Sequence, residues 1–436
     1  MMITNVKTPL PGPNSSKYKD MSAKFEANCL NAQAPIVWDH AQGVKVWDVD
    51  GNTFIDWTSG VLVTNVGHSH PKLADAISKQ AYRLLNCYDS PTVERITLAE
   101  RMVNTAPENL NTAFFATVGS EAVDAAVRVA KHFTGNFEMI SFFGGFHGRT
   151  MGTMALAGKT GTKRHFGPVV PGVIHVPFAD PYRNPFGSDS DDVVSQCLDF
   201  MDKVVGAQST GSLAGLIVEP YQGASGFIFP PDGFLKGIQE WCRDHDVIFI
   251  LDEVQASFGR TGKFYALEWE GLRPNMVTVG KGIGSGMPIS CLLAEHRIMG
   301  TLGEGEMSST WGGNPICTAA THAILDIFEE ENLVENSRTI GEYMKGRLLE
   351  MKDKCRYLGD VRGRGLVMGL DIVKDKKTKE RDPQTTRTII NKCAENGLLI
   401  GAVAGNVIRV APPLVITKEE ADESLDIMEK VLTRLD

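Results

Sequence analysis

The chain of 436 residues lacks long apolar runs and paired cysteines. A membrane-spanning helix needs about 18 consecutive apolar residues, and the sequence contains no such run. The eight cysteines are far apart and form no CxxC pairs, which argues against a disulfide framework or a zinc ribbon. The N-terminal segment has no apolar centre and is interrupted by Pro11 and Pro13, which argues against a signal peptide. We therefore expect a cytoplasmic protein with reduced cysteines and no membrane contact.

The sequence also has fewer basic than acidic residues. The 44 lysines and arginines are outnumbered by 53 aspartates and glutamates, and the net charge is -9. Nucleic acids and anionic membranes thus have no broad electrostatic reason to bind, and we expect neither as a partner. The single basic run, residues 374–381, is predicted to be a solvated loop.

Short apolar runs alternate with longer segments of helical period between about residues 60 and 325. The runs lack polar alternation, as expected of strands covered on both faces. One intervening segment, 234–246, places Leu235, Ile238, Trp241 and Cys242 on one helix face. The pattern predicts an α/β fold with a mostly parallel sheet covered by helices. The expected strands are 113–117, 139–143, 173–176, 213–219, 247–251, 276–279 and 289–294.

The two ends of the chain differ from this pattern. We expect residues 1–60 and 326–436 to build a smaller α+β domain beside a large domain formed by residues 61–325. Residues 45–57 predict a hairpin around Asp50-Gly-Asn52, and residues 361–373 predict a strand. Thr417 and Glu420 have the spacing of a capping box that opens the last helix.

Two polar residues follow predicted buried strands. Asp252 comes directly after a strand and should lie at the carboxyl edge of the sheet, where open α/β proteins bind ligands. Taken alone, it also fits an ordinary strand-end loop. Lys281 lies between Gly280 and Gly282 after the next strand, and a lysine held close to the backbone suits a Schiff-base nucleophile. A lysine in a surface turn is the alternative interpretation.

Two glycine-containing segments follow other strands. Residues 117–126 open a helix, with Gly119 for close backbone approach and Ser120 as a candidate N-cap, and free N–H groups at such a helix start suit a phosphate. In residues 143–150, Phe146 can stack on a planar ring and Arg149 can bind a carboxylate through its guanidinium fork. Each segment by itself also fits ordinary loop structure.

Two further patterns have weaker readings. His68 and His70, with His147 as a third ligand, suggest a metal site, but the same segment fits ordinary structure and we expect no metal. The glycines at 282, 284 and 286 resemble a dinucleotide fingerprint. That fingerprint requires a following helix, whereas residues 289–294 predict a strand, so we reject it.

These segments, taken together and in this order, resemble the class III aminotransferases of fold type I, the group of 4-aminobutyrate and ornithine aminotransferases. The resemblance runs from about Val37 to the C-terminus. The motifs that carry it are DVDGNTFIDW, NVGHSHP, TVGSEAVDAA, FFGGFHGRT, VEPYQG, ILDEVQASFGRTGKF, VGKGIGSGMP, STWGGNP, VRGRGLVMG and IRVAPPL.

The resemblance implies pyridoxal 5′-phosphate as the cofactor. It implies that Lys281 forms the Schiff base with the cofactor and then moves a proton between the substrate Cα and the cofactor. It also implies that Asp252 pairs with the pyridinium nitrogen, so that the ring accepts electrons. The further residues expected at the cofactor are Gln255 at the ring hydroxyl, Phe146 and His147 at the ring, Gly119 and Ser120 at the phosphate, and Glu219.

The resemblance assigns substrate and subunit contacts as well. Thr310 is expected to reach the phosphate of a neighbouring subunit, which implies a homodimer, or a tetramer built from dimers. Arg149 corresponds to the arginine that holds the far carboxylate of 4-aminobutyrate. Arg409 corresponds to the arginine that binds the α-carboxylate of the amino-acid or 2-oxo-acid partner.

The implied activity is transfer of an amino group from a small, ω-amino acid such as 4-aminobutyrate to 2-oxoglutarate or pyruvate, by a ping-pong route through pyridoxamine phosphate. Amino-acid racemases and epimerases of the same family are the alternative. The sequence departs from the family where EPVQGEGG is usual, because Ala224 replaces the second glutamate. In the family that glutamate pairs with the arginine matching Arg409. Its loss favours donors that use Arg409 directly, or acceptors such as pyruvate.

Overall fold

The computed structural model describes residues 3–30, 34–187 and 192–435. These residues form two compact units. Unit 1 consists of the described parts of 1–71, 259–262 and 331–436, and unit 2 consists of those of 72–258 and 263–330. Among the described residues, no helix is both long and apolar enough to cross a membrane.

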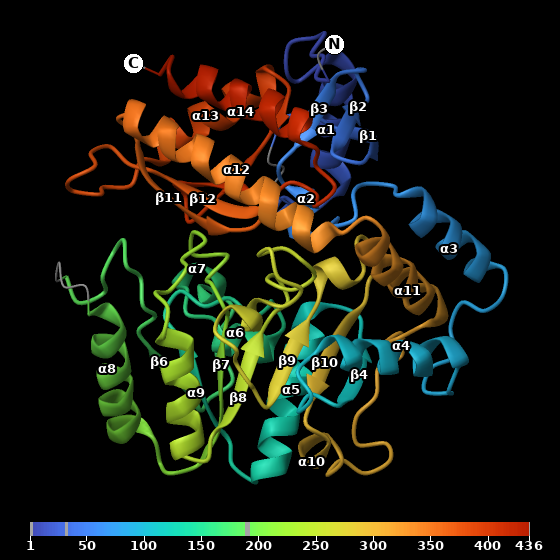
Figure 1. Cartoon of the computed structure of the whole chain (residues 1–436), viewed down its shortest axis with the longest axis vertical. Coiled ribbons are helices and arrows are strands. Elements are labelled where there is room, and N and C mark those ends of the chain that lie inside the picture. The colour runs from blue at the N-terminus through green and yellow to red at the C-terminus, as the bar shows by residue number, and fades with distance from the viewer. Residues whose placement is uncertain (1–2, 31–33, 188–191, 436) are drawn as a thin grey trace. The chain divides into compact units, whose positions relative to one another are not determined.

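Unit 2 is built on a seven-stranded sheet with the order β4-β10-β9-β8-β7-β5-β6. Strand β10 runs antiparallel to its neighbours β4 and β9, and all other neighbours are parallel (Figure 1). The predicted α/β fold with a mostly parallel sheet is confirmed. The strands are β4 (Thr112–Ala116), β5 (Glu138–Phe142), β6 (Val173–Val176), β7 (Leu213–Val218), β8 (Ile248–Asp252), β9 (Met276–Val279) and β10 (Ser290–Ala294).

The direction of the crossovers decides which face each helix covers. The steps from β6 to β7 and from β7 to β8 move toward β4, whereas the step from β4 to β5 moves the opposite way. Right-handed crossovers therefore place α8 and α9 on one face and α5 on the other, as Figure 1 shows. The helices of unit 2 are α3 (Pro71–Ala81), α4 (Val93–Thr105), α5 (Gly119–Thr134), α6 (Met151–Leu156), α7 (Thr160–Lys163), α8 (Val193–Gln208), α9 (Phe234–Asp244), α10 (His296–Met299) and α11 (Pro315–Glu330), with short 3-10 turns at Ala266–Trp269 and Lys281–Ile283.

The core of unit 2 lies between α5 and the sheet. Val123 and Val129 of α5 are fully buried in one apolar cluster with Ile217, Ile250 and Leu292 from three strands. Every residue of β5, β8, β9 and β10 is buried. Such strands need no polar alternation, which explains the continuous apolar runs in the sequence.

Unit 1 contains two four-stranded sheets, ordered β1-β2-β3-β13 and β11-β12-β15-β14. The predicted hairpin is confirmed, because β2 and β3 pair antiparallel on either side of Asp50–Asn52. The single strand predicted at 361–373 is wrong. Two antiparallel strands lie there, and the chain reverses at Gly365, where φ is +55°. The strands are β1 (Trp38–Gln42), β2 (Lys45–Asp48), β3 (Thr53–Asp56), β11 (Leu358–Arg364), β12 (Val367–Ile372), β13 (Leu398–Leu399), β14 (Gly401–Val403) and β15 (Val407–Val410).

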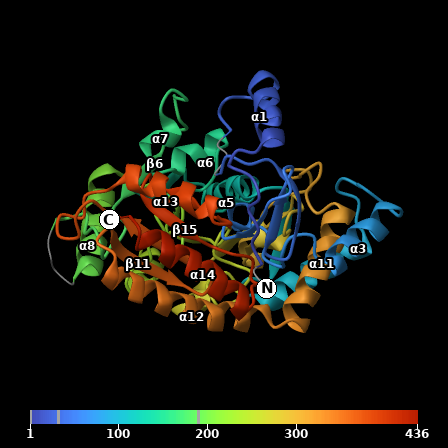
Figure 2. The same ribbon diagram turned by 90° about the horizontal axis from the view of Figure 1, so that it is seen from above.

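Long helices accompany these sheets. Figure 2 shows α14 between α12 and α13 within unit 1. The last of them begins as predicted, because Thr417 and Glu420 form a reciprocal capping box with backbone N–H groups. The helices of unit 1 are α1 (Pro13–Phe25), α2 (Ser59–Leu62), α12 (Leu333–Lys354), α13 (Pro383–Glu395) and α14 (Lys418–Leu432).

Candidate active site

The polar residues singled out in unit 2 follow the carboxyl ends of its parallel strands. Asp252 ends β8, Glu219 follows β7, and Lys281 comes two residues after β9. Gly119 follows β4, and Phe146 lies in the loop after β5. Because parallel strands end at the same edge of a sheet, all five residues lie along the edge where open α/β folds bind ligands.

A buried group of three ionisable side chains lies at the centre of this edge. The Asp252 carboxylate, 5% exposed, lies 2.7 Å from His147 Nδ1 through its Oδ2. Its Oδ1 accepts hydrogen bonds from Thr278 Oγ1 and the Val254 backbone N–H, both at 3.1 Å. A carboxylate with this many donors is held rigidly in one orientation.

The pKa values in this group reflect burial and mutual charge. Burial lowers the pKa of His147, but the hydrogen bond to Asp252 and the charges of Asp252 and Glu219 outweigh burial and leave the pKa raised. Burial raises the pKa of Glu219 to about 7. The hydrogen bond to Asp252 thus favours the protonated form of His147, because opposite charges at this distance compensate each other in a low-dielectric setting.

Glu219 also joins two loops. Its Oε1 accepts the Phe146 backbone N–H at 2.9 Å, and its Oε2 accepts the Gly223 backbone N–H at 3.2 Å. The loop after β5 and the loop after β7 are thus fixed to each other through one side chain. Phe146 is half-buried, and the exposed Arg149 guanidinium lies 6.0 Å from its ring centroid.

Gln255 presents an unsatisfied acceptor. Its Oε1 is buried and has no hydrogen-bond partner in the part of the chain that the structure describes. Gly223 leaves the space for this amide, because a Cβ there would lie 1.9 Å from Gln255 Oε1. A buried acceptor without a partner is costly and indicates that a ligand donor belongs beside it.

The start of α5 forms a backbone cradle. The helix begins at Gly119, inside the segment 117–126 that is predicted to open a helix, and a Cβ on Gly119 would lie 2.6 Å from Val254 Cγ1. The prediction of Ser120 as N-cap is wrong, because Val118 holds that position and makes no side-chain capping bond. Ser120 lies in the first turn instead, where N–H groups lack intrahelical acceptors and suit a phosphate.

Lys281 begins a short 3-10 turn with an unusual backbone. Its φ is +47°, in the left-handed region that a non-glycine residue rarely adopts. Strain of this kind persists where surrounding structure fixes it, and it is concentrated at functional sites. Asp252 pairs in register with Thr278 on β9, so Lys281 follows three residues beyond the strand partner of Asp252.

Two predicted site residues do not follow the carboxyl end of a parallel strand. Thr310 is exposed on the segment between α10 and α11 of unit 2. Arg409 belongs to unit 1, on β15, and is 7% exposed. Its strand neighbours on both sides are glycines, Gly369 and Gly401, which leave lateral room for the guanidinium.

Each of the three histidines that the sequence offers as possible metal ligands contacts a carboxylate. His68 Nε2 lies 2.9 Å from Asp56 Oδ2, and His70 Nε2 lies 2.8 Å from Glu331 Oε1, both within unit 1. His147 contacts Asp252 in unit 2. The three imidazoles therefore have separate carboxylate partners, and the contacts do not join them in one cluster.

Sequence reasoning missed Thr278, which orients Asp252 from the neighbouring strand. A signal was present, because Thr278 is the one polar residue of a four-residue strand that is buried throughout. It also missed Glu253, a fully buried carboxyl group whose oxygens accept the backbone N–H groups of Ala266 at 2.9 Å and Leu267 at 2.7 Å. Glu253 therefore positions the turn that follows and belongs to the frame of the site.

Glu253 leads to a prediction about stability and pH. Burial raises its pKa to about 8, above the ordinary 4.5. Between these two pKa values the folded state holds a proton that the unfolded state releases. The contribution of Glu253 to the free energy of unfolding is therefore full below pH 4.5 and is lost as pH rises through about 8. Glu253→Gln removes this dependence on pH. The difference in free energy of unfolding between the wild type and Glu253→Gln should therefore shrink by about 3–5 kcal/mol between pH 5 and pH 9. Urea unfolding across this range measures it, and a constant difference would contradict it.

Comparison with known proteins agrees with this geometry. The model of the aminotransferase class-III family matches residues 28–432. A probable 4-aminobutyrate aminotransferase of Bacillus subtilis is 37% identical over 399 residues, covering 89% of this chain and 91% of the relative. An isoleucine 2-epimerase of Lentilactobacillus buchneri is 36% identical over 427 residues, covering 97% and 94%. An amine transaminase from an uncultivated Pseudomonas species, solved in its pyridoxal-phosphate-bound form, superposes with a TM-score of 0.89 at 28% identity, covering 95% and 99%.

The fold and the family define a pyridoxal-phosphate enzyme of fold type I. The chain belongs to the class III aminotransferases, and its cofactor is pyridoxal 5′-phosphate. The residues described above fit this cofactor. The carboxylate of Asp252 suits a protonated ring nitrogen, the unpaired Gln255 Oε1 suits a ring hydroxyl, and the cradle at Gly119 suits a phosphate.

Proposed function

We propose that this enzyme transfers the amino group of a small ω-amino acid, such as 4-aminobutyrate, to 2-oxoglutarate or pyruvate. The observation that carries the pyridoxal-phosphate chemistry of the proposal is the buried Asp252 carboxylate, held by three donors at the end of β8, whose neighbour β9 leads to Lys281. A relative named as a probable 4-aminobutyrate aminotransferase supports the choice of donor.

The residues of this chain then have distinct tasks. When bound, pyridoxal phosphate supplies an electron-accepting ring that takes up the electron pair left at the substrate Cα. Asp252 keeps a proton on the ring nitrogen, and His147 fixes the orientation of Asp252. Lys281 holds the cofactor covalently and carries the proton to and from Cα. Phe146 would contact the ring, and Gln255 would accept a hydrogen bond from its hydroxyl.

Two arginines are proposed to bind substrate carboxylates. Arg149 is exposed beside the Phe146 ring, where its fork can take the far carboxylate of an ω-amino acid. Arg409 is proposed to bind the α-carboxylate of the second substrate. A donor with its amino group and carboxylate at opposite ends would use Arg149, and a 2-oxo acid would use Arg409.

We also propose that the enzyme is a homodimer in which Thr310 contacts the cofactor phosphate of the neighbouring subunit. Thr310 is exposed, and the side chain of Trp311 beside it is 63% exposed. Large apolar side chains of α4 are exposed on the same unit, including Val93 at 72% and Ile96 at 59%. Exposed apolar surface of this kind favours a protein partner, and sedimentation of the holoenzyme tests the dimer.

The activity is tested by mixing holoenzyme with single amino acids in the absence of an acceptor. 4-Aminobutyrate, β-alanine, ornithine, alanine and isoleucine are added in turn, and the cofactor absorbance is followed. The proposal expects a stoichiometric loss of the yellow colour with an ω-amino acid, because the amino group stays on the cofactor. Persistence of the colour with every donor would contradict amino transfer.

A racemase or epimerase is the second candidate, because an isoleucine 2-epimerase is 36% identical over nearly the whole chain. Such an enzyme returns the proton to the opposite face of Cα and releases no 2-oxo acid. In the same experiment the yellow colour would persist while the optical rotation of alanine or isoleucine decays. The two readouts therefore separate the two activities.

Ala224 provides a prediction about donor choice. Lys159 Nζ donates to the Ala224 carbonyl at 2.6 Å, so the loop is anchored through its backbone and tolerates a new side chain. Ala224→Glu restores the carboxylate that pairs with the family arginine matching Arg409. We expect the kcat/KM for 4-aminobutyrate relative to that for alanine to rise about tenfold, as one charge-assisted contact allows.

Ala224→Gln is the matched control, because it has the same size without the charge. It should leave the ratio of the two kcat/KM values within about twofold of the wild type. An equal shift in both variants would mean that bulk, and not charge, sets the preference. An unchanged ratio in Ala224→Glu would contradict the assignment of Ala224 to the donor site.

A further inference from the structure

The segment between α10 and α11 follows α5 from its end to its beginning. His132 Nε2, in the last turn of α5, contacts the Thr301 carbonyl at 3.2 Å. Arg128, one turn earlier, donates to the Glu306 carbonyl at 2.9 Å. In the first turn of α5, Glu121 accepts a hydrogen bond from Ser309 at 2.6 Å. The segment thus arrives at the phosphate cradle directly before Thr310.

Glu121 contacts the cradle and the segment at once. Its Oε1 accepts the Ser309 hydroxyl, and its Oε2 accepts both the backbone N–H of Thr117 at 2.8 Å and its hydroxyl at 2.5 Å. Burial raises the pKa of Glu121, but the hydrogen bonds from Ser309 and Thr117 outweigh burial and hold the pKa below its usual value. The side chain is therefore an ionised acceptor whose two oxygens serve two different parts of the chain.

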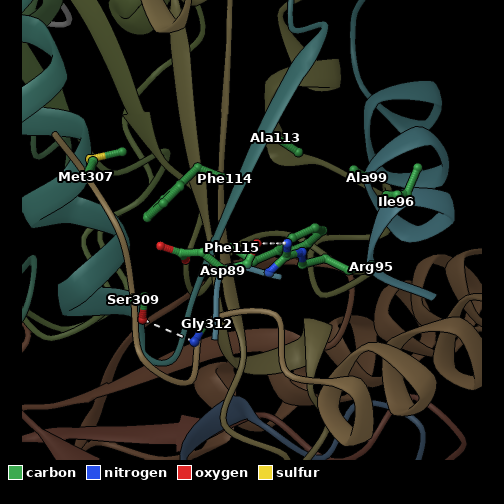
Figure 3. A pocket seen from close by; sticks show the side chains of 10 residues that line it. All are labelled: Asp89, Arg95, Ile96, Ala99, Ala113, Phe114, Phe115, Met307, Ser309 and Gly312. Carbon is green, nitrogen blue, oxygen red and sulfur yellow. Dashed lines mark hydrogen bonds between the residues drawn. The ribbon is translucent and has the colours of Figure 1, made fainter. Parts of the chain in front are cut away.

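A cavity lies beside the turn at residues 309–312. It has a volume of about 310 Å³ and is lined by Arg95, Phe114, Phe115, Ser309 and Gly312 among others (Figure 3). Within the turn, the Gly312 backbone N–H donates to Ser309 Oγ at 3.1 Å, as Figure 3 shows. Because a cavity supplies few van der Waals contacts, polar links contribute to the position of this turn on the side that faces the cavity.

A second link holds the preceding residue. The hydroxyls of Tyr88 and Ser308 are 3.1 Å apart, and the Arg95 guanidinium donates to the Tyr88 carbonyl at 2.9 Å. This link leads toward α4 and away from the cradle. Two adjacent serines of one turn are thus attached to different elements, and the Ser309 link is the one that reaches α5.

We propose that Glu121 is a positioning residue that couples the phosphate cradle at the start of α5 to the 308–312 turn, so that filling the cradle orders the residues that present Thr310. A phosphate drawn to the N–H groups of Gly119 and Ser120 fixes the cradle and Thr117 with it. Thr117 then holds Glu121, and Glu121 holds Ser309. The consequence for the dimer rests on the proposed function. Cofactor binding in one subunit orients the Thr310 of that subunit for its contact with the cofactor phosphate of the other subunit.

The experiment compares wild type, Glu121→Gln, Ser309→Ala and Ser308→Ala, each with and without the cofactor. Hydrogen exchange of peptides covering residues 308–312 reports the order of the turn, and cofactor release during dialysis reports its binding. In Glu121→Gln one of the two accepting oxygens becomes an NH2 donor, so the side chain cannot accept from both Thr117 and Ser309. In Ser309→Ala the hydroxyl link is missing. Ser308→Ala is the control, because its hydroxyl contacts Tyr88 and not Glu121.

The proposal expects cofactor binding to slow exchange of the turn in wild type and in Ser308→Ala. In Glu121→Gln and Ser309→Ala the turn should exchange at the same rate with and without cofactor, and release should be about tenfold faster, as loss of a hydrogen bond to a charged group allows. If the turn still responds to cofactor in both of these variants, Glu121 does not couple the two parts.

The dimer contact is tested separately by Thr310→Ala. Unchanged cofactor release in that variant, with a monomeric mass for the holoenzyme, would overturn the proposed contact between subunits. The exchange measurement is independent of that result, because Glu121, Thr117 and Ser309 belong to one chain. The two failures are therefore distinguishable.

Discussion

Lys281→Ala is expected to lower kcat/KM for amino transfer by about 10⁴-fold. The size follows from two tasks lost together, covalent attachment of the cofactor and proton transfer at Cα. The left-handed backbone at Lys281, with φ of +47°, presents this side chain from a turn that few non-glycine residues adopt. Steady-state kinetics with saturating cofactor measures the loss.

A direct readout accompanies the rate. Borohydride reduction of the wild-type holoenzyme should leave the cofactor attached to the peptide that contains Lys281, and peptide mass mapping should find no such adduct in Lys281→Ala. Lys236→Ala is the control, because Lys236 is exposed on α9 of the same unit. A cofactor adduct on another lysine, or retained activity in Lys281→Ala, would contradict the assignment.

Asp252→Asn is expected to lower kcat by about 10³-fold while the protein stays folded. The amide has the shape of the carboxylate but lacks the charge that keeps a proton on a ring nitrogen. Asp252 also raises the pKa of His147, so removal of its charge should lower that pKa and His147 should lose its proton at lower pH. NMR titration of His147 gives a readout that a purely structural role would not move.

Thr278→Val separates charge from orientation. This substitution removes one hydroxyl donor to Asp252 Oδ1 but keeps the carboxylate, His147 and the Val254 N–H. The loss in kcat should stay within about tenfold, the value of one hydrogen bond. Equal losses in Thr278→Val and Asp252→Asn would mean that the carboxylate charge is not what matters.

Much of unit 2 could be predicted because burial acts directly on composition. A strand covered on both faces is largely apolar, so runs such as 139–143 and 247–251 are visible in the sequence. The polar residues that end these strands stood out for the same reason. Asp252 and Lys281 are identified by their position after a run, and the segment 117–126 that opens α5 by its glycine next to a strand.

Other features depend on contacts that spacing does not encode. The sequence of residues 361–373 predicts one strand, because the reversal between β11 and β12 needs only the left-handed Gly365. The sequence predicts Ser120 as the N-cap of α5, but Val118 ends the preceding loop in an extended conformation and takes the cap position. The link from Glu121 to Ser309 joins residues 188 positions apart, and no local pattern announces it.

The antiparallel direction of β10 sets a minimum length for the segment that follows it, residues 301–309. Because β10 carries the chain away from the catalytic edge, residues 301–309 must return over the 11 residues of α5 from His132 to Glu121. That helical distance is about 16 Å, whereas eight extended peptide units reach about 28 Å. The return path thus has slack of roughly three residues. Deletions of up to roughly three residues from this segment should be tolerated. Longer deletions should pull the turn that contains Thr310 away from the start of α5.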